Sequence, residues 1–438
     1  MATENDFITP DGLLVYETAN VVGNTTSSDM YASLTNSLAQ PSVSFDFYKS
    51  KRLDSRINFT RASTGSYYNS KGVLSYAAVN EPRFDYDPVT GVSKGFLIEE
   101  ARTNLITYSE QFDISPWVIS SDCTIIPNLT TTSPDGKLSA YLFTANLGNG
   151  DLRQEIAINT NKIYTASTFI KAGSATSIYF RDQQTDVHII IDMSTFTVTS
   201  TAGTLLSYGV VSVGNGWYRV FMTYNSTTTL ALLTVRTNGA GSLYVWGVQL
   251  EVGPGATSYI PTIASTVTRT QDVTLIKDDN FSSWYTANCV VYVEASGTNI
   301  SAPPYSIIFS LDNDDSTNYI TLFYYGGSPN LGNISVRTTD GVTYNEAAIN
   351  AGTVVNDTFC KIAVLINNQP GNTSNYITGY VNGVGTTFTN SALPTDITRL
   401  RIGTYRYDQQ LNGHIKKIAF YQLTGTNATA NSLMAMTL

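Results

Sequence analysis

Alternation of apolar and polar residues is the clearest pattern in residues 106–262. The stretch "YVWGVQLEV" puts five apolar side chains on one predicted face: Tyr244, Trp246, Val248, Leu250 and Val252. The stretch "WYRVFMTY" does the same with Tyr218, Val220, Met222 and Tyr224. Period-two alternation is typical of strands with one buried face, and several such runs between turns are typical of a β-sandwich. We therefore predict a jelly roll over residues 106–262.

Residues 281–438 form a second region with strand patterns. The strand candidates are "YSIIFSL", "YITLFYY", "CKIAVLI", "YITGYVNGV", "LRIGTYRY" and "HIKKIAFYQ". Within them, Asn382-Gly383 predicts a hairpin turn, because a type I′ turn needs positive φ at both central residues. The tail "NATANSLMAMTL" is expected to form a short terminal helix. The chain is thus predicted to be all-β, with two tandem β-sandwich domains.

The remaining segments have less apolar area. Residues 1–45 are rich in Asn, Thr and Ser and hold too few large apolar residues for a core of their own. We interpret them as an extended attachment or stalk segment. Residues 46–105 contain short strand patterns between turn signals and form a connecting β-rich block. Residues 263–280 lose aromatics and gain charge, and are expected to be a linker.

Composition narrows the class of protein. Apolar residues make up 42% of the 438 residues, charged residues only 13%, and Tyr occurs 28 times, which favours β-structure with an uncharged polar surface. The net charge of −9 argues against nucleic-acid binding, which needs a positive patch. The sequence shows no signal peptide and no apolar run long enough to enter a membrane. The composition is typical of an extracellular or virion β-protein, yet no secretion signal is present. A phage virion component made in the host cytoplasm would have both properties.

Residues for common catalytic or cofactor chemistry are sparse. The three cysteines, Cys123, Cys289 and Cys360, are widely spaced and are expected to be free, buried thiols. The two histidines, His188 and His414, lie in strand contexts without a nucleophile motif. No metal-binding or nucleotide-binding motif occurs, so no cofactor, metal or catalytic residue is predicted.

Acidic residues offer the remaining route to chemistry. Glu99 and Glu100 in "GFLIEEARTNL" are adjacent, so on a strand they point to opposite faces and do not form the facing pair that a glycosidase needs. The run Asp312–Asp315 lies between two apolar strands. We interpret it as a hairpin turn, with calcium binding as the alternative.

Aromatic side chains are the better candidates for binding a sugar, since sugar rings stack on Tyr and Trp faces. The candidates are Trp117, Tyr324, Tyr325, Tyr405 and Tyr407. On alternating strands about half of the aromatic residues face the core, so a structural role is an equal alternative for each.

Three motifs carry a resemblance to a known family: "TRAST" at 60–64, "NEPRFDYDPVTG" at 80–91 and "LIEEARTNL" at 97–105. In this order they resemble a block that recurs in fibre and tail proteins of tailed bacteriophages. The next region, ending "VWGVQLEVGPGATSYIPT", resembles carbohydrate-binding-module-like jelly rolls. Residues 281–438 are similar to concanavalin-like laminin-G sandwiches.

The resemblance implies that "EEARTNL" serves architecture. Arg102 would pair with Glu99 or Glu100, and with Arg83 or Asp85, to fix the corner between stalk and jelly roll.

The resemblance also implies a non-enzymatic virion fibre or spike subunit, with a tail fibre favoured, that binds host surface polysaccharide. It would form a homotrimer and contact other virion proteins through residues 1–45. The alternatives are a head-fibre, decoration or assembly protein without glycan binding, and an enzyme that modifies capsule or lipopolysaccharide.

Overall fold

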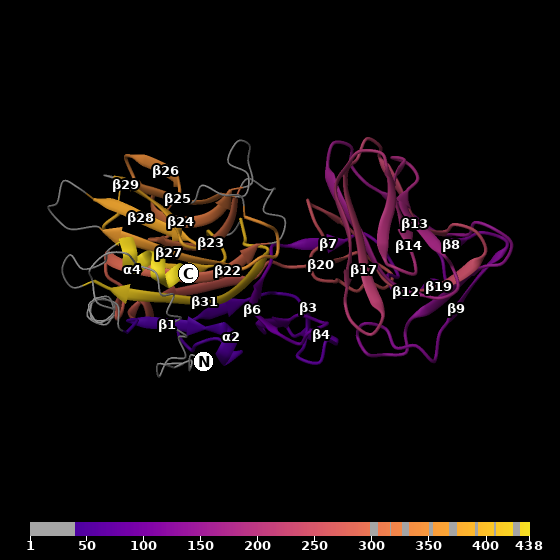
Figure 1. Ribbon diagram of the computed structural model, residues 1–438, viewed down its shortest axis with the longest axis horizontal. Helices are drawn as coiled ribbons and strands as arrows, with labels where there is room; N and C mark the ends of the chain where they lie inside the picture. Colours follow the sequence, from indigo (N-terminus) through magenta and orange to yellow (C-terminus); the bar gives the residue numbers. More distant parts are fainter. Residues whose placement is uncertain are drawn as a thin grey trace, which may run out of the picture. The chain divides into compact units, whose positions relative to one another are not determined.

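The computed structural model of the protein describes residues 40–297, 305–315, 317–325, 333–349, 354–367, 375–389, 393–406, 409–423 and 430–438. Almost all regular structure in these residues is β-strand, arranged in four large antiparallel sheets (Figure 1). The all-β prediction with two sandwiches is therefore confirmed. Most of the expected attachment segment lies outside the described residues. None of the described helices is long and apolar enough to cross a membrane.

The first sandwich is built from residues 118–252 and consists of two six-stranded sheets. One sheet has the order β16-β17-β12-β19-β10-β9, with the bounds Leu205–Ser212, Trp217–Asn225, Ile163–Ala172, Gly241–Val252, Tyr141–Ala145 and Cys123–Pro127. The other has the order β15-β14-β13-β18-β11-β8, with the bounds Thr197–Ala202, Val187–Asp192, Ser177–Asp182, Leu230–Thr237, Asp151–Ala157 and Val118–Ile119. Val220, Met222 and Tyr224 of β17 face the core between the sheets, as the alternation predicts.

The face predicted for β19 is wrong because this strand changes sides part-way. The pairing of β12 with β19 shifts register after Gln249↔Ser167, and Gly247 there has a φ of +62°. A bulge moves the following side chains to the other face. Val248 and Leu250 therefore face the main core, whereas Trp246 packs in a separate small cluster.

The second sandwich draws strands from both ends of the described chain. Its eight-stranded sheet has the order β29-β28-β27-β22-β31-β6-β5, and β1 also pairs with β31 (Figure 1). The bounds in this order are Val384–Thr389, Tyr376–Val381, Cys360–Asn367, Asn288–Gly297, Gly413–Gln422, Ser93–Ile98 and Arg83–Tyr86, with β1 at Val43–Asp46. The hairpin between β28 and β29 turns at Asn382 and Gly383, both with positive φ, as predicted.

The facing seven-stranded sheet has the order β2-β21-β30-β23-β24-β25-β26. Its bounds are Asn58–Thr60, Val273–Lys277, Arg399–Ile402, Tyr305–Asp312, Asn318–Tyr325, Asn333–Asp340 and Tyr344–Ala348. Two small sheets complete the described β-structure: β3–β4, at Gly65–Tyr68 and Leu74–Ala77, and β7–β20, at Arg102–Asn104 and Val267–Arg269. Short helices are α2 at Phe47–Ser50, α3 at Asp279–Ser282 and the predicted terminal helix, α4, at Ala430–Thr437.

These pairings correct the expected domain boundaries. Residues 263–280 are not a linker, since they contain β20 and β21. Residues 46–105 do not merely connect two domains, because β2, β5 and β6 belong to the sheets of the second sandwich. The first sandwich is thus inserted into the second, between β7 and β20, which pair with each other. Local sequence patterns do not predict this arrangement, because the paired strands are far apart in the sequence. For example, β1 pairs with β31 at Val43↔Phe420.

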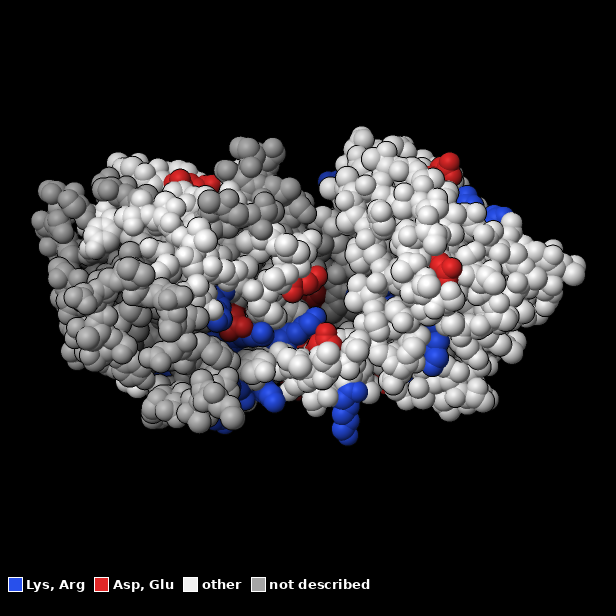
Figure 2. Space-filling view, in the orientation of Figure 1, with Lys and Arg blue, Asp and Glu red and all other residues white. Residues whose placement is uncertain are grey.

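The surface agrees with the low content of charged residues. On the face shown in Figure 2, most described atoms belong to uncharged residues, and the Lys, Arg, Asp and Glu side chains are few and scattered. Cys289 and Cys360 are buried in the core as free thiols, whereas Cys123 is half-buried.

Candidate functional site

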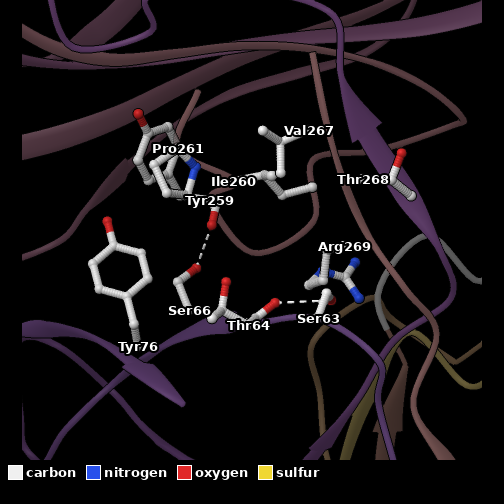
Figure 3. A pocket seen from close by; sticks show the side chains of 11 residues that line it. Ser63, Thr64, Ser66, Tyr76, Tyr259, Ile260, Pro261, Val267, Thr268 and Arg269 are labelled. Carbon is white, nitrogen blue, oxygen red and sulfur yellow. Dashed lines mark hydrogen bonds between the residues drawn. The ribbon is translucent and has the colours of Figure 1, made fainter. Parts of the chain in front are cut away.

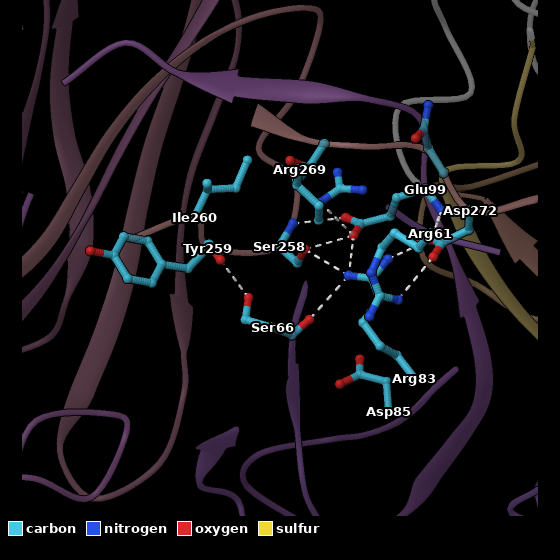
Figure 4. A network of polar contacts seen from close by, with 12 residues as sticks. Arg61, Ser66, Arg83, Asp85, Glu99, Ser258, Tyr259, Ile260, Arg269 and Asp272 are labelled. Atoms are coloured by element: carbon cyan, nitrogen blue, oxygen red, sulfur yellow. Dashed lines mark hydrogen bonds and ion pairs between the residues drawn. The ribbon is translucent and has the colours of Figure 1, made fainter. Parts of the chain in front are cut away.

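A buried ionic network lies where the inserted sandwich joins the second one, and Arg83 of β5 is at its centre (Figure 4). One guanidinium nitrogen of Arg83, Nη1, donates to Glu99 Oε2 at 2.6 Å and to Ser258 Oγ at 2.8 Å. The other, Nη2, donates to Asp272 Oδ2. Glu99 also accepts from the Ser258 backbone N–H at 2.7 Å. The network therefore ties segments before and after the inserted sandwich to one arginine.

Asp272 extends the network to a second arginine. Its Oδ1 accepts from Arg61 Nη1 at 3.1 Å, and its Oδ2 accepts from the Glu99 backbone N–H at 2.9 Å. Arg61 also donates to the Ala78 carbonyl at 2.8 Å. Two-sided pairing of this kind uses the planar fork of arginine, which lysine does not offer.

The electrostatics of the network act most strongly on Glu99. Burial alone would raise the pKa of its carboxyl, but Arg269 and Arg83 beside it, with hydrogen bonds from Ser258, hold the pKa far below its ordinary value of 4.5. Glu99 is therefore ionised in the folded protein.

This lowered pKa predicts a pH dependence of stability. Between its unfolded and folded pKa values Glu99 binds more protons in the unfolded chain, so its contribution is complete above about pH 4.5 and is lost as pH falls below it. We expect Glu99→Gln to be destabilised relative to wild type at pH 7, and the difference to shrink steadily as the pH is lowered below 4.5. Urea unfolding of both proteins across pH 3–7 measures this difference; a gap that stays constant would contradict the prediction.

The neighbouring carboxylate has different partners. Glu100 Oε1 lies 2.6 Å from Arg102 Nη2 and also accepts from Asn412 Nδ2 at 2.6 Å. Arg102 Nε lies 3.6 Å from Glu251 Oε2. Of the two carboxylates expected near Arg102, its ion pair is with Glu100. The adjacent acids of "GFLIEEARTNL" are thus bound separately, each to its own arginine.

Asp85 was expected to pair with Arg102, but its partners are different. Its Oδ2 lies 2.8 Å from His414 Nε2, and its Oδ1 accepts from the Tyr68 backbone N–H at 2.7 Å. On β5 its side chain is two residues from that of Arg83, but it makes a separate buried pair with the last strand, β31. His414, the second residue of β31, is buried in this pair.

A second candidate site lies on the seven-stranded sheet, where one arginine is surrounded by aromatic rings. We call it the aromatic face, and it consists of Tyr305, Phe323, Tyr325, Arg337 and Tyr344. The guanidinium carbon of Arg337 lies 4.0 Å from the ring centre of Tyr305, 4.9 Å from that of Phe323 and 5.5 Å from that of Tyr344. Glu346 holds the guanidinium, with Arg337 Nη2 at 2.8 Å from its Oε2. Tyr344 is 56% exposed, so the cluster has a ring open to solvent.

The face arises from alternation along β24. Ile320, Leu322 and Tyr324 point into the core of the second sandwich. Phe323 and Tyr325, between and after them, therefore point the other way, where Tyr325 meets Tyr305 at 5.5 Å between ring centres.

The prediction of a sugar-binding role is wrong for Tyr324 and Trp117, because both side chains are buried. Tyr324 is fully buried and donates to the Ala295 carbonyl at 3.0 Å. Trp117 is 7% exposed, packs edge-on against Phe112 and donates to the Tyr108 carbonyl at 2.9 Å. Neither presents a ring to a ligand, because each fills a core.

The other predicted aromatics have varied positions. Tyr325 belongs to the aromatic face, and Tyr405 is half-buried with its ring centre 5.0 Å from that of Tyr319. Tyr407 lies outside the described residues.

The acidic turn at 312–315 has arginine counter-ions. Asp312 is buried and accepts from Arg401 Nε at 3.0 Å, while Asp314 lies 3.0 Å from Arg399 Nη1. Asp315 accepts from the Thr317 backbone N–H at 2.7 Å, a bond typical of a turn. The contacts of this run are those of a hairpin turn held by β30.

Sequence reasoning missed Arg61, Ser258, Arg269 and Asp272 of the network, and Tyr305, Phe323, Arg337 and Tyr344 of the aromatic face. Arg61 and Asp272 lie in "TRAST" and "TRTQD", where an arginine recurs in a chain with few charges. That recurrence is a weak signal, and it does not show that the two segments meet.

Comparisons with known proteins are limited to distant structures. No family model matches the chain, and no curated protein is significantly similar to it. Domain 4 of AbnA, a GH43 extracellular arabinanase from Geobacillus stearothermophilus, solved with arabinotriose, is 14% identical, with a TM-score of 0.31 over 42% of this chain and 82% of that one. The CBM40 of the Ruminococcus gnavus IT-sialidase is 15% identical, with a TM-score of 0.27 over 34% and 82%. The tandem CBM22 domains of Paenibacillus barcinonensis Xyn10C are 9% identical, with a TM-score of 0.23 over 75% and 98%.

Proposed function

We propose that the protein is a non-enzymatic subunit of a tailed-phage fibre or spike that binds bacterial surface glycan through the aromatic face. The observation that carries this proposal is the exposed ring of Tyr344 beside Arg337 and Glu346. A sugar ring stacks its apolar face on such a tyrosine, while guanidinium and carboxylate groups bond its hydroxyls. A tail fibre is the favoured location.

The virion context is proposed from the sequence. The ordered motifs at 60–64, 80–91 and 97–105 resemble tailed-phage fibre proteins, and the sparsely charged surface is compatible with that class. Residues 1–45 would contact other virion proteins, except that β1, which begins in this range at Val43, already belongs to the second sandwich. A homotrimer would present three aromatic faces, and this multivalency would strengthen weak single sites.

Tyr344→Ala is expected to weaken glycan binding about two- to tenfold, because an aromatic stacking contact is worth about 0.5–1.5 kcal/mol. The matched control is Tyr208→Ala, since Tyr208 is 48% exposed but lies on β16 of the other sandwich. Binding is measured by surface plasmon resonance on immobilised polysaccharide. Equal losses in both variants would contradict a role for the aromatic face.

The proposal as a whole is tested by size-exclusion chromatography with light scattering on the protein mixed with a panel of bacterial surface polysaccharides. We expect intact polymer to elute together with the protein. Shortened polymer would instead favour an enzyme that degrades capsule or lipopolysaccharide. Independent elution from every polymer would favour a head-fibre, decoration or assembly protein.

A further inference from the structure

A small pocket lies next to the buried network, between the β3–β4 segment and residues 259–269 (Figure 3). Its volume is about 40 Å³, and polar side chains on its wall include those of Ser63, Thr64, Tyr76 and Arg269. Pockets that enclose a whole small molecule have about 300–1,000 Å³, so this one accepts only a single small group of a larger ligand.

Arg269 is the unusual residue of the pocket wall. It is 1% exposed, and within the described part of the chain its Nε, Nη1 and Nη2 have no hydrogen-bond partner. Its nearest acid is Glu99, whose Oε2 lies 3.5 Å from Nε. Buried donors are nearly always paired in folded proteins, and a charged group left without hydrogen bonds costs more than a neutral one.

The neighbouring acids are already occupied. Glu99 accepts from Arg83 and from Ser258, and Asp272 accepts from Arg83 and Arg61. The network thus sets three guanidinium groups (Arg61, Arg83 and Arg269) against two carboxylates (Glu99 and Asp272), and the hydrogen bonds of both carboxylates go to partners other than Arg269.

A further acid nearby, Glu251, balances the charge of the wider cluster, since Arg102 already pairs with Glu100, but it gives Arg269 no hydrogen bond. Glu251 accepts from Gln249 Nε2 at 2.7 Å and from Thr257 Oγ1 at 2.7 Å. It also lies beside Arg102. Burial lowers the pKa of Arg269, although Glu99 acts in the opposite direction. An anion in the pocket would offset this cost of burial.

We propose that this pocket binds the carboxylate of an acidic sugar residue through Arg269. A carboxylate matches the paired donors of a guanidinium and takes the place of the missing hydrogen-bond partners. The hydroxyls of Thr64 and Tyr76 on the same wall suit the sugar hydroxyls that follow the carboxylate. The ligand class is therefore a uronate or a similar sugar acid. This inference rests on the proposed glycan binding and adds to it a preference for acidic polymers.

The test is isothermal titration calorimetry of the full-length protein with sodium glucuronate at constant ionic strength. We expect saturable binding by wild type, and binding about tenfold weaker or more in Arg269→Gln, because hydrogen bonds to charged groups are worth about 1.5–3 kcal/mol. The matched control is Arg153→Gln, since the Arg153 side chain is 37% exposed on β11 and lies outside the pocket lining. It should bind glucuronate like wild type.

Further ligands separate the possible outcomes. Glucose should not bind at the concentrations used, and acetate should compete with glucuronate for the wild-type protein. Tighter binding of phosphate, or of a short peptide with a free C-terminal carboxylate, would overturn the assignment to a sugar acid. Equal glucuronate affinity in wild type and Arg269→Gln would overturn the site itself, as would no saturable binding.

Two controls keep the test decisive. Circular dichroism checks that Arg269→Gln is folded; if it is not, Thr64→Val replaces it, with weaker glucuronate binding expected and unchanged binding counting against the pocket. Failure here is distinct from failure of the proposed function. If polymers elute together with wild type but not with Tyr344→Ala, and glucuronate does not bind, the proposed glycan binding is supported and only the acidic-sugar pocket is contradicted.

Discussion

Arg83→Ala is expected to lower the free energy of unfolding by about 3–5 kcal/mol, because it leaves the buried carboxylates of Glu99 and Asp272 without their main partner. Arg83 is fully buried and sits between both acids, so solvent does not replace it. The other two arginines do not compensate, since Arg61 already binds Asp272 and Arg269 makes no hydrogen bond to Glu99. Urea unfolding at pH 7, followed by circular dichroism, measures the loss.

The control for this prediction is Arg56→Ala. Arg56 pairs with Asp54 at 2.8 Å, but the two side chains are 33% and 32% exposed. Exposed pairs of this kind contribute about 0–1 kcal/mol, because water and salt screen them. If Arg83→Ala were no more destabilising than Arg56→Ala, the buried network would not be what holds this junction.

Trp246→Ala is expected to cost about 3–5 kcal/mol through the cavity left by the indole ring. Trp246 is fully buried in a small cluster with Phe169, Tyr259 and Leu74 of β4. Its ring centre lies 5.3 Å from that of Phe169 and 4.8 Å from that of Tyr259, and its Nε1 donates to Ser139 Oγ at 3.0 Å. The cluster joins β19 to the β3–β4 segment with apolar contacts, next to the ionic network.

The comparison variant is Trp246→Phe, which keeps one ring in the cluster and should lose less than half as much stability. Chemical unfolding of both variants gives the two values. Similar losses would show that the hydrogen bond to Ser139, and not the packed ring, is the main contribution of Trp246.

The sequence predicts the strands better than their arrangement. Alternation correctly places Val220 and Met222 in a core, and the Asn382-Gly383 turn follows from local backbone preference. The face of β19 could not be predicted, because a single bulge at Gly247 reverses the phase of every later residue. The domain boundaries failed because pairing such as Val43↔Phe420 leaves no trace in local patterns.

In the candidate site, too, the sequence predicted some local features but not the contacts between distant segments. An ionic role for Arg83 and Glu99 followed from the resemblance to fibre proteins, whereas Asp272 was missed because it lies 173 residues beyond Glu99. For the aromatic face, Tyr324 and Tyr325 are equal candidates in the sequence, since alternation fixes that they point oppositely but not which one faces the core. The structure decides that by placing Tyr324 against Ala295.

The insertion of one sandwich into the other has a consequence for how the chain folds as it is synthesised. The strands of the inserted sandwich lie within residues 118–252, and its core adds Ile106 and Phe112 from just before them, so it can fold as soon as residue 252 has left the ribosome. The strands β1 and β6 leave earlier but must wait for β31, at 413–422, which lies between them and β22. Closure of the outer sandwich is therefore among the last steps, and a chain ended before residue 413 should keep a protease-resistant inner sandwich beside an unfolded outer one.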